Sequence, residues 1–253
     1  MLALGLTSAT GIAGAFAEPP AASVSKHSTT TSSDSSPTAA LPALQVLTIG
    51  DSIMNGHGLP SGDAWPYLVA SVEGWDVTND GCDGAGVLTP GDPAKCDSDY
   101  AGIISASAAM SPNIVIIEGS SNDFDLDNSA LLVATISEVQ SIKFEFPSAQ
   151  IVGLSTLWGS TVPQAELAQV NAQVKVAVTD AGGTYLDIGQ PMEGHPELMQ
   201  ADDVHPTAAG QAVLATTIEH ALGPVERAAI EAEQADAARV ARVHELVALG
   251  DLE

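Results

Sequence analysis

Four short polar segments bring together the residue types that acyl transfer requires. They are GDS at residues 50–52, NDGCDGAG at 79–86, SSND at 120–123 and DDVH at 202–205. They contain a serine hydroxyl, a glycine-rich loop, an asparagine and an Asp/His pair, which can supply a nucleophile, its base and donors for an oxyanion. Taken alone, Ser52 is equally consistent with a residue that merely caps a helix after a strand.

The predicted strands indicate where these four segments lie in the fold. Residues 44–49 (LQVLTI) form an apolar run rich in β-branched residues, which is typical of a buried strand. Further strands are predicted in WDVTND (75–80), NIVIIEG (113–119), AQIVGLSTLW (149–158) and TYLDIG (184–189). The carboxyl ends of parallel strands meet at one edge of an open α/β sheet, where ligands bind. We therefore expect all four polar segments at the same edge.

Helices are predicted between the strands from their apolar periodicity and end signals. One begins after Ser61 or Asp63, and one runs from Asp127 or Asn128 to Pro147. A third begins at Thr161 with Pro163 and stops at Gly182-Gly183, and the last runs from Thr207 to Gly223. Strands separated by helices of this length imply right-handed crossovers and a parallel sheet covered on both faces. The predicted fold class is α/β, in three layers.

The four segments resemble, in order, the four motifs of the SGNH, or GDSL-type, esterases and lipases. The resemblance covers residues 44–223, and GLPSGDAWPYLVA (58–70) is similar to the Trp-Pro helix that follows the nucleophile in many bacterial members. It implies a flavodoxin-like parallel sheet and no cofactor. It also implies these roles: Ser52 as nucleophile, His205 as base, Asp202 as its orienting acid, and an oxyanion hole formed by the N–H groups of Ser52 and Gly84 and the side chain of Asn122.

Two of these roles have rivals within their own segments. Asp202 lies three residues before His205, a spacing that lets a turn aim its carboxylate at one ring nitrogen, but Asp203 is an alternative partner. Gly84 fits the Asn-x-Gly-x-x-Gly spacing of the family, although it could be an ordinary turn glycine like its neighbours Gly81 and Gly86.

One segment departs from the family pattern. Where the family has Gly-x-Asn-Asp, this chain has Ser120-Ser121-Asn122-Asp123, with the glycine one place earlier at Gly119. The change keeps Asn122 but alters the backbone where the preceding strand ends. It therefore affects the direction in which the Asn122 side chain points.

Three further histidines have no predicted catalytic role. His57, His195 and His220 are expected at the surface. A metal site formed by His195 with Glu193 and Glu197 is a weaker alternative, because three ligands in one loop are a poor signal. No metal ion is expected.

The charge balance argues against several classes of partner. Seven Lys and Arg against 32 Asp and Glu give a formal net charge of −25, which repels nucleic acid and anionic lipid. Solubility, or tolerance of a salty medium, explains the acidity. Five acids are expected at the site edge: Asp51, Asp80, Asp83, Asp123 and Asp125. With no long apolar insertion that could form a lid, they predict a short, neutral acyl substrate, such as an acetylated carbohydrate or a small alkyl ester.

The two ends of the chain predict export and an appendage. Residues 1–17 resemble a signal peptide ending in an Ala-Phe-Ala cleavage site, too short to span a membrane and without a preceding Lys or Arg. Residues 18–43 are predicted to be a disordered Ser/Thr/Pro-rich linker. Residues 224–253 are predicted to form an amphipathic helix with Val240, Val243 and Val247 on one stripe, either docked on the domain, which we favour, or contacting a partner.

In an exported protein, Cys82 and Cys96 are expected to form a disulfide, with two unpaired thiols as the alternative. The function predicted from all these features is that of a secreted serine esterase acting on small-molecule or carbohydrate esters. The alternatives are an acyltransferase that uses a sugar hydroxyl as acceptor and a noncatalytic module that binds carbohydrate or a surface.

Overall fold

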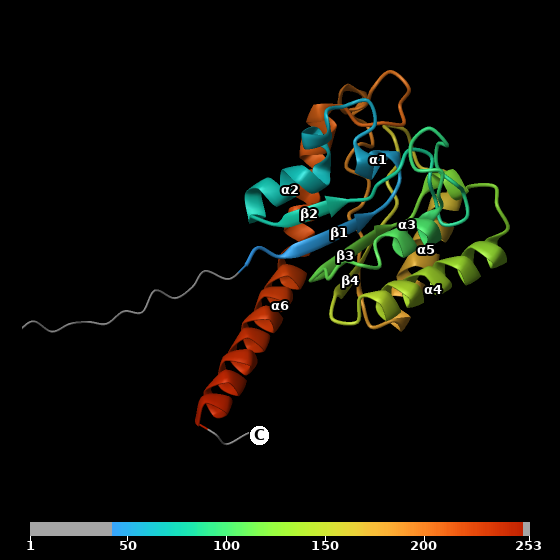
Figure 1. Cartoon of the computed structure of the whole chain (residues 1–253). Coiled ribbons are helices and arrows are strands. Elements are labelled where there is room, and N and C mark those ends of the chain that lie inside the picture. The colour runs from blue at the N-terminus through green and yellow to red at the C-terminus, as the bar shows by residue number, and fades with distance from the viewer. Residues whose placement is uncertain (1–41, 250–253) are drawn as a thin grey trace, which may run out of the picture. The chain divides into compact units, whose positions relative to one another are not determined.

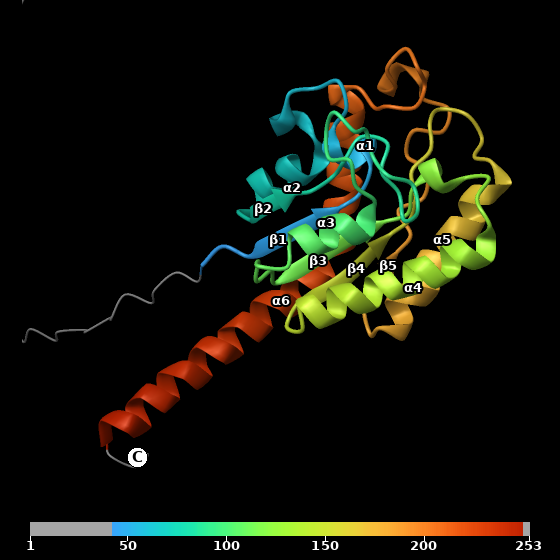
Figure 2. The ribbon, with the colours of Figure 1, turned by 45° about the vertical axis from the view of Figure 1, so that its right-hand side comes forward.

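A single parallel sheet of five strands organises the chain, in the order β2-β1-β3-β4-β5 (Figures 1 and 2). The computed structural model describes residues 42–249, so the predicted signal peptide and nearly all of the predicted linker lie outside the described residues. The strands are β1 (Gln45–Ile49), β2 (Asp76–Asn79), β3 (Ile114–Glu118), β4 (Gln150–Leu154) and β5 (Thr184–Leu186). The helices are α1 (Ser52–Asn55), α2 (Trp65–Glu73), α3 (Tyr100–Ala106), α4 (Asn128–Glu145), α5 (Ala165–Asp180) and α6 (Ala208–Leu249), and short 3-10 turns occur at Ser61–Asp63, Ser121–Asp123 and Pro196–Leu198.

Helices cover both faces of this sheet. α2 and α6 pack on one face, and α3, α4 and α5 pack on the other (Figures 1 and 2). Successive side chains of a strand point to opposite faces, so Ile114 and Ile116 of β3 enter the first layer while Val115 and Ile117 enter the second. Burial on both faces explains the continuous apolar runs of the central strands. The predicted three-layer α/β/α fold with a flavodoxin-like strand order is confirmed.

The predicted starts of α4 and α6 agree with the structure, whereas the predicted start of α5 is wrong, because this helix begins at Ala165, after Gln164, and not at Thr161 with Pro163. Asp127 caps α4 by accepting from Ala130 N (2.8 Å), and Thr207 Oγ1 accepts from Gly210 N (3.2 Å) at the start of α6. The prediction that Ser61 or Asp63 caps α2 is wrong, because these residues form a separate 3-10 turn and α2 begins after Ala64. α3 was not predicted, since its seven residues are too few to show a periodicity.

The predicted stop of the last helix at Gly223 is also wrong. α6 continues through Gly223 and Pro224 as one helix of 42 residues. A proline inside a helix costs roughly 3 kcal/mol. Burial of Val225 and Ala229 against the sheet, together with a hydrogen bond from Trp75 Nε1 to the Glu226 carboxylate (2.8 Å), offsets that cost. Tertiary contacts therefore override the local stop signal.

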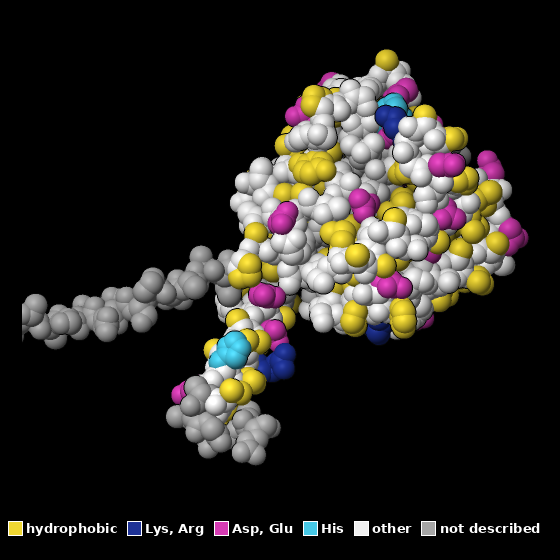
Figure 3. Space-filling model, in the orientation of Figure 1, with side chains coloured by type: hydrophobic (Ala, Val, Ile, Leu, Met, Phe, Trp, Pro, Cys, Tyr) yellow, Lys and Arg dark blue, Asp and Glu magenta, His cyan; other side chains and the backbone are white. Residues whose placement is uncertain are grey.

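The distal part of α6 does not dock, contrary to the interpretation that we favoured. Asn113 Nδ2 donates to Glu233 Oε2 (3.0 Å), but the side chains from residue 234 to 245 are exposed, as is Val247. The predicted stripe of Val240, Val243 and Val247 therefore faces solvent in the described structure, and Figure 3 shows an Arg or Lys and a His side chain on this end of the helix. Within residues 42–249, no helix combines the length and apolar character needed to cross a membrane.

The sheet brings the four polar segments to one edge. The first follows β1, the second follows β2, the third follows β3, and the fourth lies in the loop between β5 and α6. β1 has β2 on one side and β3 on the other, so the chain reverses its direction of travel across the sheet at β1. Such a switch point leaves a crevice outside the carboxyl ends of the strands.

Candidate active site

The turn after β1 presents Ser52 as the first residue of α1. Asp51, not Ser52, caps this helix, because the Asp51 carboxylate accepts from Ile53 N (2.8 Å). The hydroxyl of Ser52 is therefore not used in capping. Ser52 is also largely buried, which shields its hydroxyl from bulk water.

Two buried carboxyl groups, those of Asp51 and Glu118, hold this turn in place. Asp51 accepts a hydrogen bond from Ser120 Oγ (2.7 Å), and its backbone N–H donates to Glu118 Oε1 (3.3 Å). Burial raises the pKa of Glu118 well above its usual range, and the neighbouring Asp51 adds to the effect. A Cβ at Gly50 would lie 2.5 Å from Glu118 Oε1 and 2.6 Å from Met54 Sδ, so a larger residue before Asp51 would displace one of these side chains.

His205 joins Ser52 to Asp202 in a continuous hydrogen-bonded chain. His205 Nε2 lies 3.0 Å from Ser52 Oγ, and His205 Nδ1 lies 2.8 Å from Asp202 Oδ2. The hydrogen bond from His205 lowers the pKa of Asp202 well below its usual range, and backbone N–H groups of His205 and Val204 lower it further. An ionised Asp202 accepts the proton of Nδ1, which leaves Nε2 as an acceptor facing Ser52.

Asp203, the alternative partner, points elsewhere. Its carboxylate accepts from Ser160 N (3.1 Å), and its backbone has a φ of 52°. This positive φ turns the two successive aspartates to different sides of the loop. The loop itself is held by Gln200, whose backbone N–H donates to the His205 carbonyl (2.8 Å).

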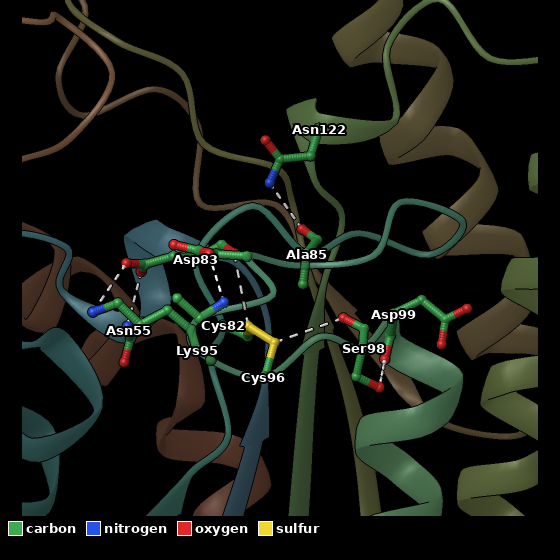
Figure 4. Close-up of a disulfide and its surroundings, with 12 residues drawn as sticks. Asn55, Cys82, Asp83, Ala85, Lys95, Cys96, Ser98, Asp99 and Asn122 are labelled. Atoms are coloured by element: carbon green, nitrogen blue, oxygen red, sulfur yellow. Dashed lines mark hydrogen bonds and ion pairs between the residues drawn. A yellow bond between two sulfur atoms is a disulfide. The ribbon is translucent and has the colours of Figure 1, made fainter.

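Asn122 lies against the glycine-rich loop. Its Nδ2 donates one hydrogen bond to the carbonyl of Ala85 (2.8 Å), next to Gly84, as Figure 4 shows. An amide nitrogen carries a second hydrogen, which remains for a ligand. Asn122 also lines a pocket of about 360 Å³. Gly84 has a φ of 78°, a conformation that favours glycine.

The shifted glycine of the third segment has a packing reason. A Cβ at Gly119 would collide with Thr156 Oγ1 and would lie 2.7 Å from Val170 Cγ1, so position 119 requires glycine. At the next position, Ser120 Oγ accepts from Asn122 N (3.1 Å) while donating to Asp51. The departure from the family pattern thus connects the backbone of Asn122 to the turn that carries Ser52.

A disulfide between Cys82 and Cys96 braces the glycine-rich loop, in the pairing expected from the sequence (Figure 4). The two Cα atoms are 6.2 Å apart, and Cys82 is buried while Cys96 is exposed. A Cβ at Gly91 would lie 2.6 Å from both sulfur atoms, so the loop passes close over the bridge. Asp92 N also donates to the Asp83 carbonyl (2.7 Å), which fixes the residue before Gly84.

Most of the five acids expected at the site edge make hydrogen bonds that hold the surrounding loops. Asp51, Asp83 and Asp123 are buried, and Asp123 accepts from the backbone N–H groups of Val87 (2.7 Å), Leu88 and Thr89. Asp80 accepts from Ser107 Oγ (2.6 Å). Of the five, only Asp125 is both exposed and part of the pocket lining. Asp203 also lines this pocket, so two carboxylates, rather than the five that the sequence suggested, lie in its wall.

The pocket that Asn122 lines also includes Ile53 and Val204, the chain neighbours of Ser52 and His205, and it has an aromatic wall. Phe124 and Trp158 stack with ring centroids 5.6 Å apart and planes at 14°. Leu157 and Val204 add apolar surface, and Gln164 adds an amide. This lining suits a small, uncharged group with both apolar and polar faces.

His57 lies at the site, a position that was not predicted from the sequence. Its side chain is 43% exposed, as expected for a surface residue, but its ring stacks on that of His205 and its Nδ1 lies 2.7 Å from Asp83 Oδ2. No local sequence pattern could have revealed these contacts. His57, Asp83 and His205 are far apart in the chain, and only the folded sheet brings their loops together at one edge.

His195 and His220, which were also expected at the surface, lie in exposed positions. His195 pairs with Glu197 (2.9 Å), and His220 Nδ1 contacts the Thr216 carbonyl (2.7 Å). Across residues 42–249, no three potential metal ligands gather at one point.

Comparisons with known proteins agree with this architecture. Among solved structures, a carbohydrate acetylesterase from Sinorhizobium meliloti has a TM-score of 0.57 at 14% identity, with 72% of this chain and 99% of that chain covered. A carbohydrate esterase family 2 enzyme from Corynascus thermopiles (Myceliophthora fergusii) has a TM-score of 0.54 at 25% identity, with 74% and 69% covered. A salicylyl-acyltransferase from a tetracycline biosynthetic pathway has a TM-score of 0.57 at 20% identity, with 73% and 55% covered.

At the sequence level, no curated protein gives a significant match. The model of the GDSL-like lipase/acylhydrolase family matches residues 48–213, most of the chain and all four polar segments. The chain therefore belongs to the GDSL-like lipase/acylhydrolase family of ester hydrolases.

Proposed function

We propose that this protein is a secreted serine esterase that hydrolyses short-chain or acetyl carboxylic esters through Ser52, His205 and Asp202. The observation that carries the proposal is the continuous chain from Ser52 Oγ through both ring nitrogens of His205 to Asp202, with distances of 3.0 and 2.8 Å. Each residue has the partner and the orientation that nucleophilic catalysis by serine requires.

The first half-reaction acylates the enzyme. His205 Nε2 takes the hydroxyl proton as Ser52 Oγ attacks the carbonyl carbon of the ester. The oxyanion that forms is bound by Ser52 N–H, Gly84 N–H and Asn122 Nδ2. When it collapses, the bond to the alcohol oxygen breaks and His205 delivers its proton to that oxygen. Asp202 stabilises the imidazolium between the two proton transfers.

The second half-reaction releases the acid. His205 Nε2 takes a proton from water, whose oxygen attacks the acyl carbon. The bond between that carbon and Ser52 Oγ then breaks, and the proton returns to Ser52 as the carboxylic acid leaves. An alcohol acceptor in place of water would make the same enzyme an acyltransferase.

The pocket supports a short acyl group on a neutral alcohol. The pocket that Asn122 lines has a volume of about 360 Å³, which is enough for a small substrate. The aromatic pair and the few polar groups of this pocket suit a sugar or a small alkyl ester. The fold is shared with a carbohydrate acetylesterase and with a carbohydrate esterase, which makes acetylated carbohydrates the first substrates to test. The acidic surface seen in Figure 3 opposes the approach of anionic esters.

Secretion is part of the proposal. It is supported by the predicted signal peptide at residues 1–17 and by the disulfide, a bond that persists in oxidising compartments. Expression of the full sequence in a secreting host should give an extracellular protein whose first residue is Glu18. An intracellular product with Met1 intact would contradict secretion.

A panel of esters tests the activity and its substrate range. We expect hydrolysis of p-nitrophenyl acetate and of acetylated oligosaccharides, turnover that declines as the acyl chain lengthens, and loss of turnover in Ser52→Ala. Ser61→Ala, which changes an exposed serine, is the matched control. Product formation that depends on acceptor concentration would favour the acyltransferase. Parental activity in a folded Ser52→Ala protein would refute the mechanism, and a parent protein that hydrolyses none of the esters would favour the binding module.

A further inference from the structure

His57 is tied to both partners of the Ser52–His205 contact. It follows Ser52 by five positions, and its backbone N–H donates to the Ser52 carbonyl (2.9 Å). Its own carbonyl accepts from Gln200 Nε2 (2.8 Å), and the same nitrogen donates to the carbonyl of Pro206 (3.0 Å), the residue after His205. The backbone of His57 is thus fixed relative to the nucleophile turn and to the loop of the base.

The ring of His57 covers one face of the ring of His205. The two centroids are 4.2 Å apart and the planes meet at 30°. Hydrogen bonds to Asp202 and Ser52 act in the plane of the His205 ring, so they control displacement out of that plane weakly. A stacked ring opposes that displacement directly.

Asp83 fixes the ring of His57 in turn. Its Oδ2 lies 2.7 Å from His57 Nδ1 and 3.9 Å from Lys95 Nζ. Its Oδ1 accepts from Asn55 Nδ2 (2.8 Å), as Figure 4 shows. Burial raises the pKa of Asp83, but hydrogen bonds from Asn55 and His57 and the charge of Lys95 outweigh that effect, so the pKa is lowered. A buried carboxylate held on both oxygens is a rigid support.

The need for this support is greatest after Ser52 has been acylated. In the acyl-enzyme, Ser52 Oγ has no proton, so its hydrogen bond to His205 Nε2 is lost. His205 then keeps Asp202, which is exposed and belongs to the same loop, and the stacked ring of His57. Nevertheless, Nε2 must still point at the attacking water to accept its proton.

We propose that His57 and Asp83 are positioning residues that hold the His205 ring during deacylation, a role that rests on the esterase mechanism proposed above. The structure supports this through three contacts: the stack on His205, the hydrogen bond between His57 Nδ1 and Asp83, and the backbone link through Gln200. Neither side chain takes part in a bond-forming step.

Steady-state turnover combined with mass spectrometry separates the two half-reactions. With saturating p-nitrophenyl acetate, quenched samples of the full-length protein give the fraction acetylated at Ser52. Turnover divided by this fraction is the deacylation rate constant, and turnover divided by the unacetylated fraction is the acylation rate constant. A variant that only lost folded protein would change neither constant once rates are normalised to reactive serine.

His57→Ala should lower the deacylation rate constant roughly three- to tenfold, in line with the strength of one aromatic pair, and should lower acylation less. The acetylated fraction then rises. His57→Phe keeps a flat ring and should restore most of the loss, and Asp83→Asn should give an intermediate effect. His195→Ala removes an exposed histidine–carboxylate pair and serves as control. If His57→Ala does not fold, His57→Gln, which keeps a donor but no ring, takes its place.

An acetylated fraction that does not rise in the ring-deleting variant overturns the positioning role, as does a Phe variant no better than the Ala variant. These outcomes leave the esterase mechanism intact. That mechanism fails separately, if Ser52→Ala hydrolyses the ester at the parental rate.

Discussion

Replacing Glu138 by glutamine should stabilise the protein, and more so as the pH rises. Glu138 lies on α4, is buried, and within the described residues its Oε2 has no hydrogen-bond partner. Burial raises its pKa from 4.5 to about 9, and the charges of Asp99 and Asp123 add to the shift. The folded protein therefore keeps a proton on Glu138 over a range of pH in which the unfolded chain has lost it.

The size of the effect follows from proton linkage. Between pH 4.5 and about 9 the folded state binds one more proton at this site than the unfolded state, so the free energy of unfolding falls as pH rises. The slope is about 1.4 kcal/mol per pH unit, which amounts to about 3 kcal/mol at pH 7 relative to acid. Glutamine keeps the shape and does not titrate, so Glu138→Gln avoids this loss.

Urea unfolding of the parent and Glu138→Gln at pH 5, 6, 7 and 8 measures the effect. The stability difference between them should be small at pH 5 and should grow steadily to pH 8. Other buried acids, such as Glu118, contribute equally to both proteins and cancel in the difference. Glu145→Gln, at an exposed position on the same helix, is the control for removing one negative charge. A stability difference independent of pH would refute the reasoning.

Three further predictions concern the site and the long helix. Asp202→Asn should lower turnover far more than Asp203→Asn, because only Asp202 fixes the tautomer of the base; equal losses in kcat/KM would contradict this. Asn122→Ala should raise the barrier by about 2.7–4 kcal/mol, seen as a fall in kcat/KM of roughly a hundred- to a thousandfold, and a loss below tenfold would exclude it from the oxyanion hole. Truncation after Gly223 should cost about 3–5 kcal/mol in urea unfolding, because it removes buried apolar side chains and a hydrogen bond to Trp75, whereas truncation after Gln234 should cost less than about 0.5 kcal/mol. Both truncated proteins should keep their turnover per folded molecule. If the two truncated proteins had a similar free energy of unfolding, the first helical turns after Gly223 would not pack as described.

Glu138 and His57 show what local sequence could not predict. A glutamate in a helix with other polar residues looks like a solvated residue, and only the packing of α4 on the sheet buries it. His57 looks like a loop residue, and only the meeting of three loops places it on His205. The burial of Asp51 and Asp123 belongs to the same class, because their partners lie about 35 to 70 positions away in the chain.

The sequence by itself determined the strands, the parallel three-layer fold and the order of the four polar segments along one sheet edge. These depend on alternation, apolar runs and turn residues, which act over a few positions. It also pointed to Ser52, Asp202 and His205, which the structure brings together, although their catalytic roles remain proposals. The tertiary structure alone decided that α6 runs through Gly223 and Pro224. Burial of its apolar face against the sheet outweighs a local stop signal, and that burial involves residues far apart in the chain.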